Sequence, residues 1–172
     1  MSKALYLGID LGTSGVRCTV VDEAGHERGH AQIRYPSPAG PIVDAEDWWR
    51  ATEACLDQQV QAMHAAGLSP KDIRALAIDG TSGSMVLVDE AIRPVTQGLM
   101  YSSAGFDAEA EVIARHAEAG SITRGSNSAL ARMLRLQSHD SENHARHLCH
   151  QADFIAARIM GRAGHSDDNN AL

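Results

Sequence analysis

Two short stretches of the sequence place a carboxylate just before a turn that a ligand can approach closely. In YLGIDLGTSGV, Asp10 ends an apolar run and is followed within two residues by Gly-Thr-Ser-Gly. In LAIDGTSGS, Asp79 ends a second apolar run and leads directly into the same four residues. Glycine lets a backbone approach a ligand, and Thr and Ser hydroxyls can donate to phosphate or sugar oxygens. Each stretch could therefore hold a phosphate on backbone amides while its aspartate orients a metal-bound water.

A simpler interpretation is open for each turn alone, because Gly, Ser, Thr and Asp are what strand-ending turns usually contain. Two such turns, each after an apolar strand and each with an aspartate, favour a functional site over this interpretation. The sequence has no GxxxxGK[ST] phosphate loop. It also lacks the GxGxxG dinucleotide pattern, and the first turn leads into a strand and not into a helix.

The elements that must position these turns alternate between strands and helices. Strand patterns cover residues 4–9, 16–23, 28–36, 73–79 and 84–90, and the stretch at 73–79 is apolar enough to be predicted as a buried strand. A helix after Asp44 carries apolar side chains at helical spacing from Trp48 to Met63 and stops near Gly67. Further helices are predicted at 107–120, 128–140 and 152–161. This order predicts an α/β fold with a mixed, five-stranded-type sheet flanked by helices.

The composition and net charge of the chain indicate which kinds of molecule it is expected to bind. The chain has 172 residues, 44% of them hydrophobic but only 4% aromatic, and a net charge of -7. We expect an aliphatic core and neither nucleic acid nor an anionic membrane as the main partner. Cys18, Cys55 and Cys149 are far apart and are expected to be buried reduced thiols. No segment has the length of a signal peptide or a membrane span, so we expect a soluble, cytoplasmic protein.

Several other groups of residues are of types that could form a site. The segment HDSENHARHLCHQAD contains five side chains that could bind a metal: His139, His144, His147, Cys149 and His150. Their spacing matches no standard zinc template, so a solvated surface is the preferred interpretation. Trp48 and Trp49 could stack on a sugar, but packing on the core is the better interpretation. Asp167 and Asp168 are expected to be solvated, and Asp153 is expected to be a helix N-cap.

The stretch GIDLGTSGVRCTVVDEAGHERG resembles the first phosphate-binding hairpin of the FGGY carbohydrate kinases, which belong to the actin-like ATPase (ribonuclease H-like) superfamily. The stretches DAEDWW, IRALAIDGTSGSMVLVDE, SALARMLRL, HQADFIAARIMG and SDDNNAL resemble later parts of the same domain in the same order. The IDGTSG form is most similar to the pentulose kinases that resemble D-ribulose kinase and xylulokinase. The resemblance implies ATP-dependent phosphorylation of a sugar hydroxyl, with ATP and Mg²⁺ as cofactors.

The resemblance also assigns residues. Asp10 and Thr13 match catalytic positions of the family. Asp10 matches the family residue near Mg²⁺ and the γ-phosphate, and it is expected to hold Mg²⁺ through water. The expected phosphate-binding residues are Gly12, Thr13, Ser14 and Gly15. The expected sugar-binding residues are Asp79, Thr81, Ser82, Gly83 and Tyr101. Many relatives have an acidic or asparagine-containing sugar-binding stretch where this chain has MYSSAGFD, with Ser102 and Ser103 beside Tyr101, so the identity of the sugar is open.

Residues 1–172 resemble most of the first, sugar-side domain of such a kinase. The general-base aspartate and most of the adenine pocket of the family lie beyond the matching region. We therefore expect the second domain to be absent, the fold to be incomplete at the C-terminus, and this chain alone to be inactive. The alternative is a nucleotide- or sugar-binding regulatory module, and glycerol or an aldonate is an alternative substrate. A small-molecule sugar and ATP are the expected ligands, and a homodimer is kept as an option.

Overall fold

The computed structural model describes residues 4–36, 40–168 and 170. The chain divides into two compact units. Unit 1 contains residues 1–38 and 46–80, and unit 2 contains residues 39–45 and 81–172. The first Gly-Thr-Ser-Gly turn lies in unit 1, whereas the second begins with Gly80 of unit 1 and continues with residues 81–83 of unit 2. The residues of each unit are therefore described separately.

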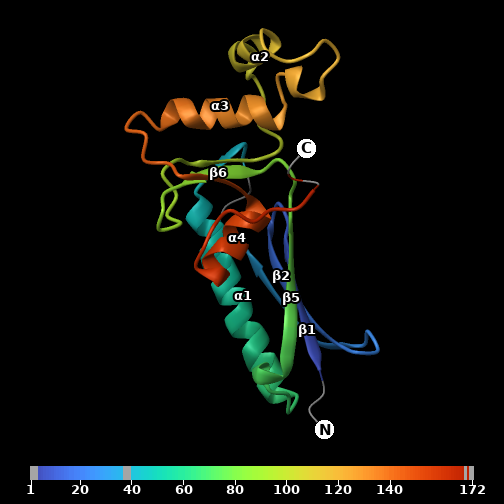
Figure 1. The fold of residues 1–172 in the computed structure, drawn as a ribbon. Coiled ribbons are helices and arrows are strands. Elements are labelled where there is room, and N and C mark those ends of the chain that lie inside the picture. Colours follow the sequence, from blue (N-terminus) through green and yellow to red (C-terminus); the bar gives the residue numbers. More distant parts are fainter. Residues whose placement is uncertain (1–3, 37–39, 169, 171–172) are drawn as a thin grey trace. The chain divides into compact units, whose positions relative to one another are not determined.

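Unit 1 is a four-stranded mixed sheet with one long helix beside it (Figure 1). Its elements are β1 (Leu5–Leu11), β2 (Gly15–Asp22), β3 (Glu27–Arg34), α1 (Ala45–Ala65), the 3₁₀ turn η1 (Pro70–Asp72) and β5 (Ile73–Gly80). The strand order is β3-β2-β1-β5. β1 and β2, and β2 and β3, pair antiparallel, whereas β1 and β5 are parallel. The ends of β1 and β5 that precede the two turns therefore lie side by side.

The core of unit 1 follows the period-two pattern of its strands and the helical spacing of α1. Alternate residues of β2 are fully buried, at Val16, Cys18 and Val20. In α1, Trp48 and Cys55 are among the buried side chains. The predicted core role of Trp48 and the predicted burial of all three cysteines are thus confirmed.

The prediction that residues 73–79 form a buried strand is wrong. These residues do form β5, but most of them are exposed, and Leu76 is 44% exposed. The physical reason is position, because β5 is at the edge of the sheet and has a strand on one side only. Apolar composition alone does not distinguish a central strand from an edge strand.

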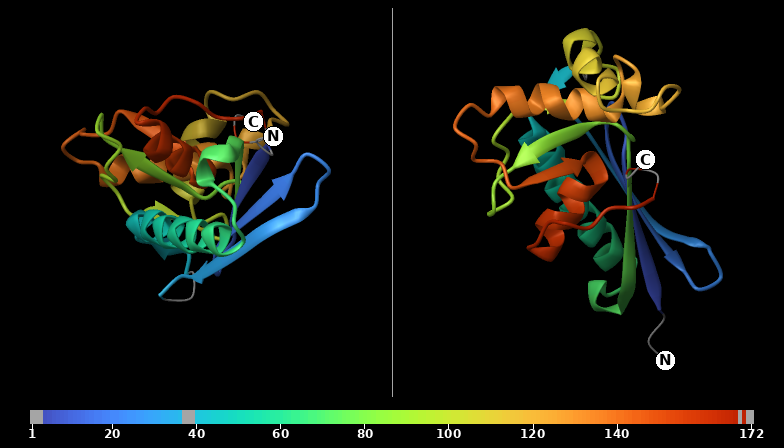
Figure 2. Two further views of the ribbon diagram at one scale, coloured as in Figure 1. Left: turned by 90° about the horizontal axis from the view of Figure 1, so that it is seen from below. Right: turned by 45° about the horizontal axis from the view of Figure 1, so that its top comes forward.

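Unit 2 contains a second sheet of four short antiparallel strands (Figure 2). The strands are β4 (Ile42–Val43), β6 (Met85–Val88), β7 (Gly98–Leu99) and β8 (His147–His150), in the order β4-β7-β6-β8. The helical elements are α2 (Asp107–Ala114), η2 (Ile122–Arg124), α3 (Ala129–His139) and α4 (Gln151–Met160). The predicted mixed α/β class is confirmed, but the described strands form two sheets of four and not a five-stranded sheet.

The core of unit 2 lies between this sheet and the helices α2 and α3. Met85 and Leu87 of β6 pack in one cluster with Phe106, Ile113 and Leu136. The amphipathic patterns that predicted α2 and α3 arise because each helix turns one face toward this cluster.

Local hydrogen bonds fix the ends of the helices in unit 2. Ser128 caps α3, and its hydroxyl accepts a hydrogen bond from the backbone N–H of Ala131 at 3.1 Å. The expected N-cap role of Asp153 is wrong, because His150 is the N-cap of α4. Asp153 lies three residues into the capping motif, where its carboxylate accepts the His150 backbone N–H at 3.1 Å. Gly161, the last residue of the helix predicted at 152–161, ends α4 with a left-handed φ of 70°.

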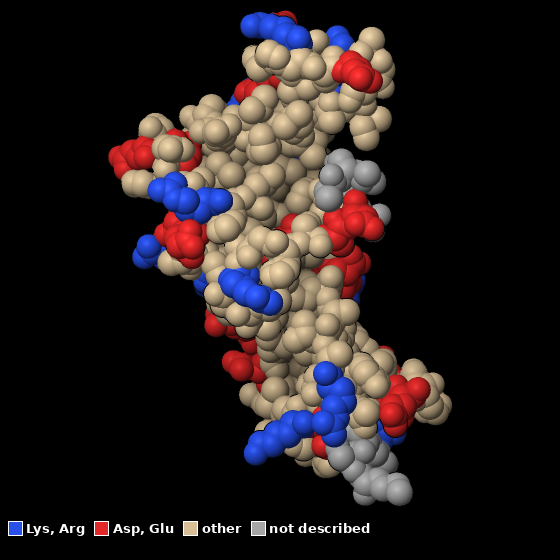
Figure 3. Space-filling model, viewed as in Figure 1, with Lys and Arg blue, Asp and Glu red and all other residues tan. Residues whose placement is uncertain are grey.

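Charged side chains of both signs are interspersed on the face shown in Figure 3. No helix among the described residues is long and apolar enough to cross a lipid bilayer.

Candidate active site

The first turn connects β1 to β2 and is held by backbone hydrogen bonds. The Gly12 N–H donates to the Gly15 carbonyl at 3.0 Å, and the Ser14 carbonyl accepts the Tyr35 N–H at 3.1 Å. Thr13 and Ser14 are exposed, and their hydroxyls have no hydrogen-bond partner within the described part of the chain. This turn therefore presents two uncommitted hydroxyls on a backbone that is already fixed.

Gly15 is required by the close approach of β3. A Cβ atom at this position would lie 2.1 Å from the Ile33 carbonyl oxygen and 2.8 Å from the Arg34 Cα atom. Both obstacles are backbone atoms of the neighbouring strand, so no side-chain rotation could relieve the contact. Gly15 thus allows the first turn to lie directly against the sheet.

Asp10 and Asp79 are direct neighbours, because they are register partners in the parallel pair β1 and β5. The Asp10 carboxylate is about half exposed and accepts a hydrogen bond from Arg17 Nη1 at 2.9 Å through Oδ2. The Asp79 carboxylate accepts the Gly80 N–H at 2.9 Å. Both aspartates and Arg17 line a pocket of about 320 Å³. The structure therefore gathers two carboxylates and one guanidinium beside the first turn.

Sequence reasoning missed Arg17. The signal for it was available, because Arg17 is on the polar face of β2 and the hairpin register places it opposite Asp10. A guanidinium is suited to phosphate oxygens, and a half-exposed carboxylate is suited to a largely hydrated Mg²⁺. Asp10 Oδ1 has no protein partner among the described residues, which leaves an oxygen for such an ion.

In the second turn, the hydroxyl of Thr81 is hydrogen-bonded to other residues of unit 2. The Thr81 hydroxyl donates to Gln151 Oε1 at 2.7 Å, and this same oxygen accepts the Thr81 N–H at 3.0 Å. Because the proton of Thr81 is committed, the Ser84 hydroxyl donates to Thr81 Oγ1 at 2.7 Å. The Ser84 oxygen in turn accepts the Tyr101 N–H at 3.0 Å. A one-directional chain of hydrogen bonds thus runs from Tyr101 through Ser84 and Thr81 to Gln151.

This chain of hydrogen bonds leaves Ser82, Gly83 and Tyr101 as the accessible part of the second turn. Ser82 is exposed, and Tyr101 is 50% exposed. Gly83 has a left-handed φ of 78°. A Cβ atom on Gly83 would lie 3.3 Å from Nη1 of Arg132 and 3.7 Å from the Tyr101 Cβ. Of the predicted sugar-binding residues, Thr81, Ser82, Gly83 and Tyr101 are brought together in unit 2, and Asp79 lies in unit 1 beside Asp10.

The histidine-rich segment is only partly solvated. His139 and His144 are exposed, as predicted, but His150 is buried at 7% exposure, so the expected solvated surface is wrong for it. Cys149 is also buried, at 2% exposure, which agrees with the separate prediction of a buried thiol and not with that of a solvated segment. β8 carries both residues into the sheet of unit 2. Burial raises the pKa of Cys149 to about 12. The described residues contain no group of three or more His, Cys, Asp or Glu side chains placed to hold a metal ion.

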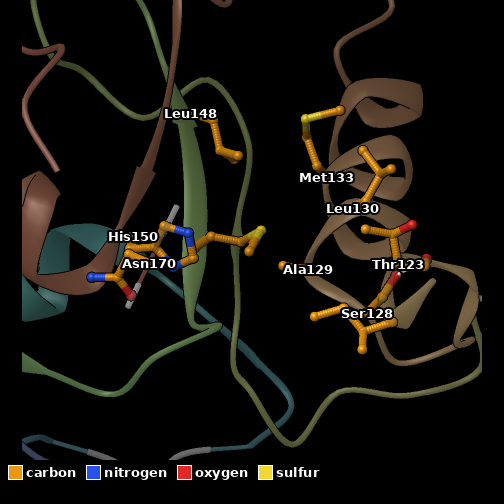
Figure 4. A pocket seen from close by; sticks show the side chains of 10 residues that line it. Thr123, Ser128, Ala129, Leu130, Met133, Leu148, His150 and Asn170 are labelled. Atoms are coloured by element: carbon orange, nitrogen blue, oxygen red, sulfur yellow. Dashed lines mark hydrogen bonds between the residues drawn. The ribbon is translucent and has the colours of Figure 1, made fainter. Parts of the chain in front are cut away.

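His150 lies at one side of a cavity of about 370 Å³ in unit 2 (Figure 4). Leu148 lies near it, and Leu130 and Met133 of α3 line the opposite side. The Nδ1 atom of His150 is buried and has no hydrogen-bond partner among the residues that the structure describes. Burial is the main reason that the pKa of His150 lies below its ordinary value, so the imidazole is neutral at pH 7.

The chain matches the N-terminal domain of the FGGY family of carbohydrate kinases over residues 5–136. It belongs to this family. Both Gly-Thr-Ser-Gly turns, Tyr101 and Arg132 lie within the matched region.

Two curated relatives each match about half of this chain. The xylulose kinase of Escherichia coli K12 is 32% identical over 104 residues, which are 57% of this chain and 20% of that protein. The glycerol kinase of Paracidovorax citrulli is 38% identical over 85 residues, which are 47% of this chain and 16% of that protein.

Solved structures cover nearly the whole chain. The xylulose kinase from Bifidobacterium adolescentis aligns with 98% of this chain and 36% of its own, with a TM-score of 0.72 and 21% identity. The Plasmodium falciparum glycerol kinase with ADP aligns with 93% of this chain and 35% of its own, with a TM-score of 0.78 and 9% identity. The predicted actin-like ATPase fold is confirmed by these likenesses. The chain spans about a third of the length of these structures and a fifth or less of these two curated relatives.

Proposed function

We propose that this chain is the sugar-side portion of a kinase that transfers the γ-phosphate of ATP to a hydroxyl of a small sugar, with a pentulose such as D-ribulose or D-xylulose as the acceptor. The observation that carries the proposal is the family match over residues 5–136, which contains both turns. The relative named xylulose kinase supports a five-carbon ketose, and the relative named glycerol kinase keeps a smaller polyol open.

In this proposal the first turn binds the phosphate that is transferred. The exposed hydroxyls of Thr13 and Ser14 and the backbone of Gly12 and Gly15 contact phosphate oxygens. Arg17 offers a guanidinium to the same oxygens, and Asp10 holds Mg²⁺ through a water molecule. Bound Mg²⁺ supplies charge neutralisation on the phosphates. Phosphoryl transfer needs positioning and electrostatic stabilisation more than covalent help, and these residue types provide both.

The second turn binds the sugar. Thr81 and Ser84 position the loop through their hydrogen bonds, while Ser82, the Gly83 backbone and Tyr101 meet the sugar. Asp79, which lies in unit 1, remains a sugar-binding candidate from the family resemblance alone. The ligands of the proposed enzyme are a sugar and Mg·ATP, its proposed location is the cytoplasm, and neither nucleic acid nor a membrane is part of the proposal.

The first test uses the purified 172-residue chain with Mg·ATP and, in turn, D-xylulose, D-ribulose and glycerol, with ADP release as the readout. We expect no turnover, because the family's general base lies beyond the matched region. Turnover that the Asp10→Asn variant abolishes would show that the chain is a competent kinase by itself.

The second test reads the coding DNA past the codon for Leu172. If the frame continues, the longer protein is assayed with the same sugars, and Asp10→Asn is expected to lower its kcat at least about 100-fold. A longer protein that binds ATP but phosphorylates no sugar would replace the kinase proposal with the alternative, a nucleotide-binding regulatory module.

A further inference from the structure

A cavity of about 370 Å³ lies within unit 2, and none of the described residues that line it is assigned to the sugar or the phosphate. Its volume is in the range of about 300–1,000 Å³ that is usual for ligand sites in proteins. Apolar side chains form much of its wall, among them Met85, Leu130, Met133 and Leu148. No Asp, Glu, Lys or Arg side chain is among the described residues that line it. The cavity therefore suits a molecule with a large apolar part.

The hydroxyl groups of the cavity wall are already hydrogen-bonded. Ser128 caps α3 and donates to the Thr123 carbonyl at 2.8 Å, and the Thr123 hydroxyl pairs with that of Ser121. Two buried polar atoms of the wall remain without a partner within the described part of the chain, namely His150 Nδ1 and Asn170 Oδ1. Both residues line the same side of the cavity, opposite α3 (Figure 4). Such atoms are rare in folded proteins, because a buried polar group that lacks a hydrogen bond lowers stability.

Both of these atoms are hydrogen-bond acceptors. The amide nitrogen of Asn170 donates to Asp167 Oδ2 at 2.9 Å, which fixes the amide with Oδ1 unpaired. Burial lowers the pKa of His150, so its ring is neutral at pH 7 and has one N–H and one lone pair. The Asn170 backbone acts in the opposite direction and raises this pKa, which means that the ring donates a hydrogen bond to it. Because Nδ1 has no partner among the described residues, the donor is Nε2, and Nδ1 has the lone pair.

We propose that this cavity binds a small neutral aromatic amine, whose –NH2 group donates one hydrogen to His150 Nδ1 and the other to Asn170 Oδ1. A hydroxyl group has only one hydrogen and would leave one acceptor unpaired. An aliphatic amine is a cation at pH 7, and its charge would be buried without a counter-charge. An amino group on an aromatic ring stays neutral, and thioether groups such as that of Met133 pack favourably on aromatic rings. The inference is independent of the proposed kinase function.

A water molecule is the simplest competitor, because it also has two hydrogens to donate. Its share of liquid volume is about 30 Å³, which is a small part of this cavity. The rest of the space is bounded by apolar side chains, which offer further water molecules little to bond to. An aromatic ring fills that space and loses its own contact with water, so the amine gains hydrophobic binding free energy that water lacks.

The test titrates the 172-residue chain with aniline, toluene and benzylamine, which share a six-membered ring and differ in the attached group. The methyl signals of Met85 and Met133 are followed by NMR, because an aromatic ring bound beside them shifts both. Aniline is expected to bind about tenfold more tightly than toluene, which corresponds to about 1.4 kcal/mol. In a cavity without free acceptors the order is reversed, because the amino group loses its hydrogen bonds to water. Benzylamine, a cation at pH 7, is expected to bind most weakly.

Two variants and a matched control identify the residues responsible. His150→Phe keeps a ring but removes one acceptor, Asn170→Ala removes the other, and each is expected to reduce the preference for aniline over toluene. His147→Phe alters the same strand at a residue that is not among those lining the cavity, and it is expected to keep the preference. If His150→Phe does not fold by circular dichroism, Asn170→Ala provides the comparison.

Three results would overturn the inference: no shift of the methionine signals with aniline, toluene binding at least as tightly as aniline, or an unchanged preference in the folded acceptor variants. The second result would mean that water molecules already satisfy both acceptors. None of the three would affect the kinase proposal, which is tested with sugars and Mg·ATP.

Discussion

The turn at residues 12–15 and the turn at residues 80–83 have the same four amino acids but use them differently. In the first, the Thr13 hydroxyl is exposed and has no partner among the described residues. In the second, the equivalent Thr81 hydroxyl is committed to Gln151 and linked to Ser84. The next residue accounts for part of the difference, because Val16 follows the first turn and Ser84 follows the second. A local sequence motif therefore determines the shape of a turn, while its neighbours determine which of its polar groups remain available to a ligand.

The two glycines that end these turns should respond differently to alanine. Gly15→Ala places a Cβ 2.1 Å from the Ile33 carbonyl oxygen and should lower the free energy of unfolding by about 3 kcal/mol or more. Gly83→Ala places an alanine at a left-handed φ of 78° and brings its Cβ into a tight contact with the movable end of the Arg132 side chain. This variant should lower the free energy of unfolding by about 1–2 kcal/mol. Denaturant unfolding of both variants measures the difference. A Gly15→Ala protein as stable as Gly83→Ala would contradict the close approach of β3 to the first turn.

Replacing each threonine by valine separates the two turns further. Thr81→Val removes one hydrogen-bond donor to Gln151 Oε1 and the acceptor for the Ser84 hydroxyl. It should therefore lower the free energy of unfolding by about 1–2 kcal/mol. Thr13→Val removes an exposed hydroxyl and should change stability by less than about 0.5 kcal/mol. Thermal unfolding of the pair gives the comparison directly. Equal losses of stability would mean that the hydrogen bonds from Thr81 to Gln151 contribute nothing net.

The longer strands and helices were predictable, because each follows from a periodic pattern within one segment. The same is true of the capping of α3 by Ser128 and of the αL end of α4 at Gly161. The two-residue strands β4 and β7 were missed, because two residues carry no periodic pattern, and α2 ends at Ala114, earlier than the predicted helix at 107–120. The exposure of β5 was not predictable, because it depends on which strand lies at the sheet edge. The division of the strands into two sheets likewise depends on pairings between distant segments.

The candidate site divides in the same way. Asp10, Asp79 and the two turns are visible in the sequence, since each is a short contiguous pattern. Gln151 is 70 residues from Thr81, and Arg132 is 31 residues from Tyr101, so no local pattern could connect them. Arg17 was within reach, because hairpin register alone places it opposite Asp10. The missed residues are those whose role arises from contacts between distant segments.

The buried His150 makes the stability of unit 2 depend on pH. The first turn contains no histidine and has no such dependence. Burial lowers the folded pKa of His150, so the unfolded chain binds a proton more readily than the folded one. Stability is therefore full above the ordinary histidine pKa and falls as pH drops below about 6.5, by at most about 1.4 kcal/mol per pH unit. Unfolding between pH 7.5 and 5.5 should show this slope in the wild type and not in His150→Leu.

The smallest expected effect on stability is at Arg17, and there the effect on binding is the informative one. Arg17 and Asp10 are each about half exposed, so Arg17→Gln should change the free energy of unfolding by less than about 0.5 kcal/mol. If Arg17 instead serves the phosphate at the first turn, the same variant should weaken Mg·ATP binding by about tenfold, because one charge-assisted hydrogen bond is lost. Calorimetric titration measures this, and Arg28→Gln, which removes a looser 3.9 Å pair with Asp22 in the same sheet, is the control. If both variants lower the affinity for Mg·ATP equally, Arg17 acts only through the net charge of unit 1. The proposed contact between Arg17 and the phosphate at the first turn would then be wrong.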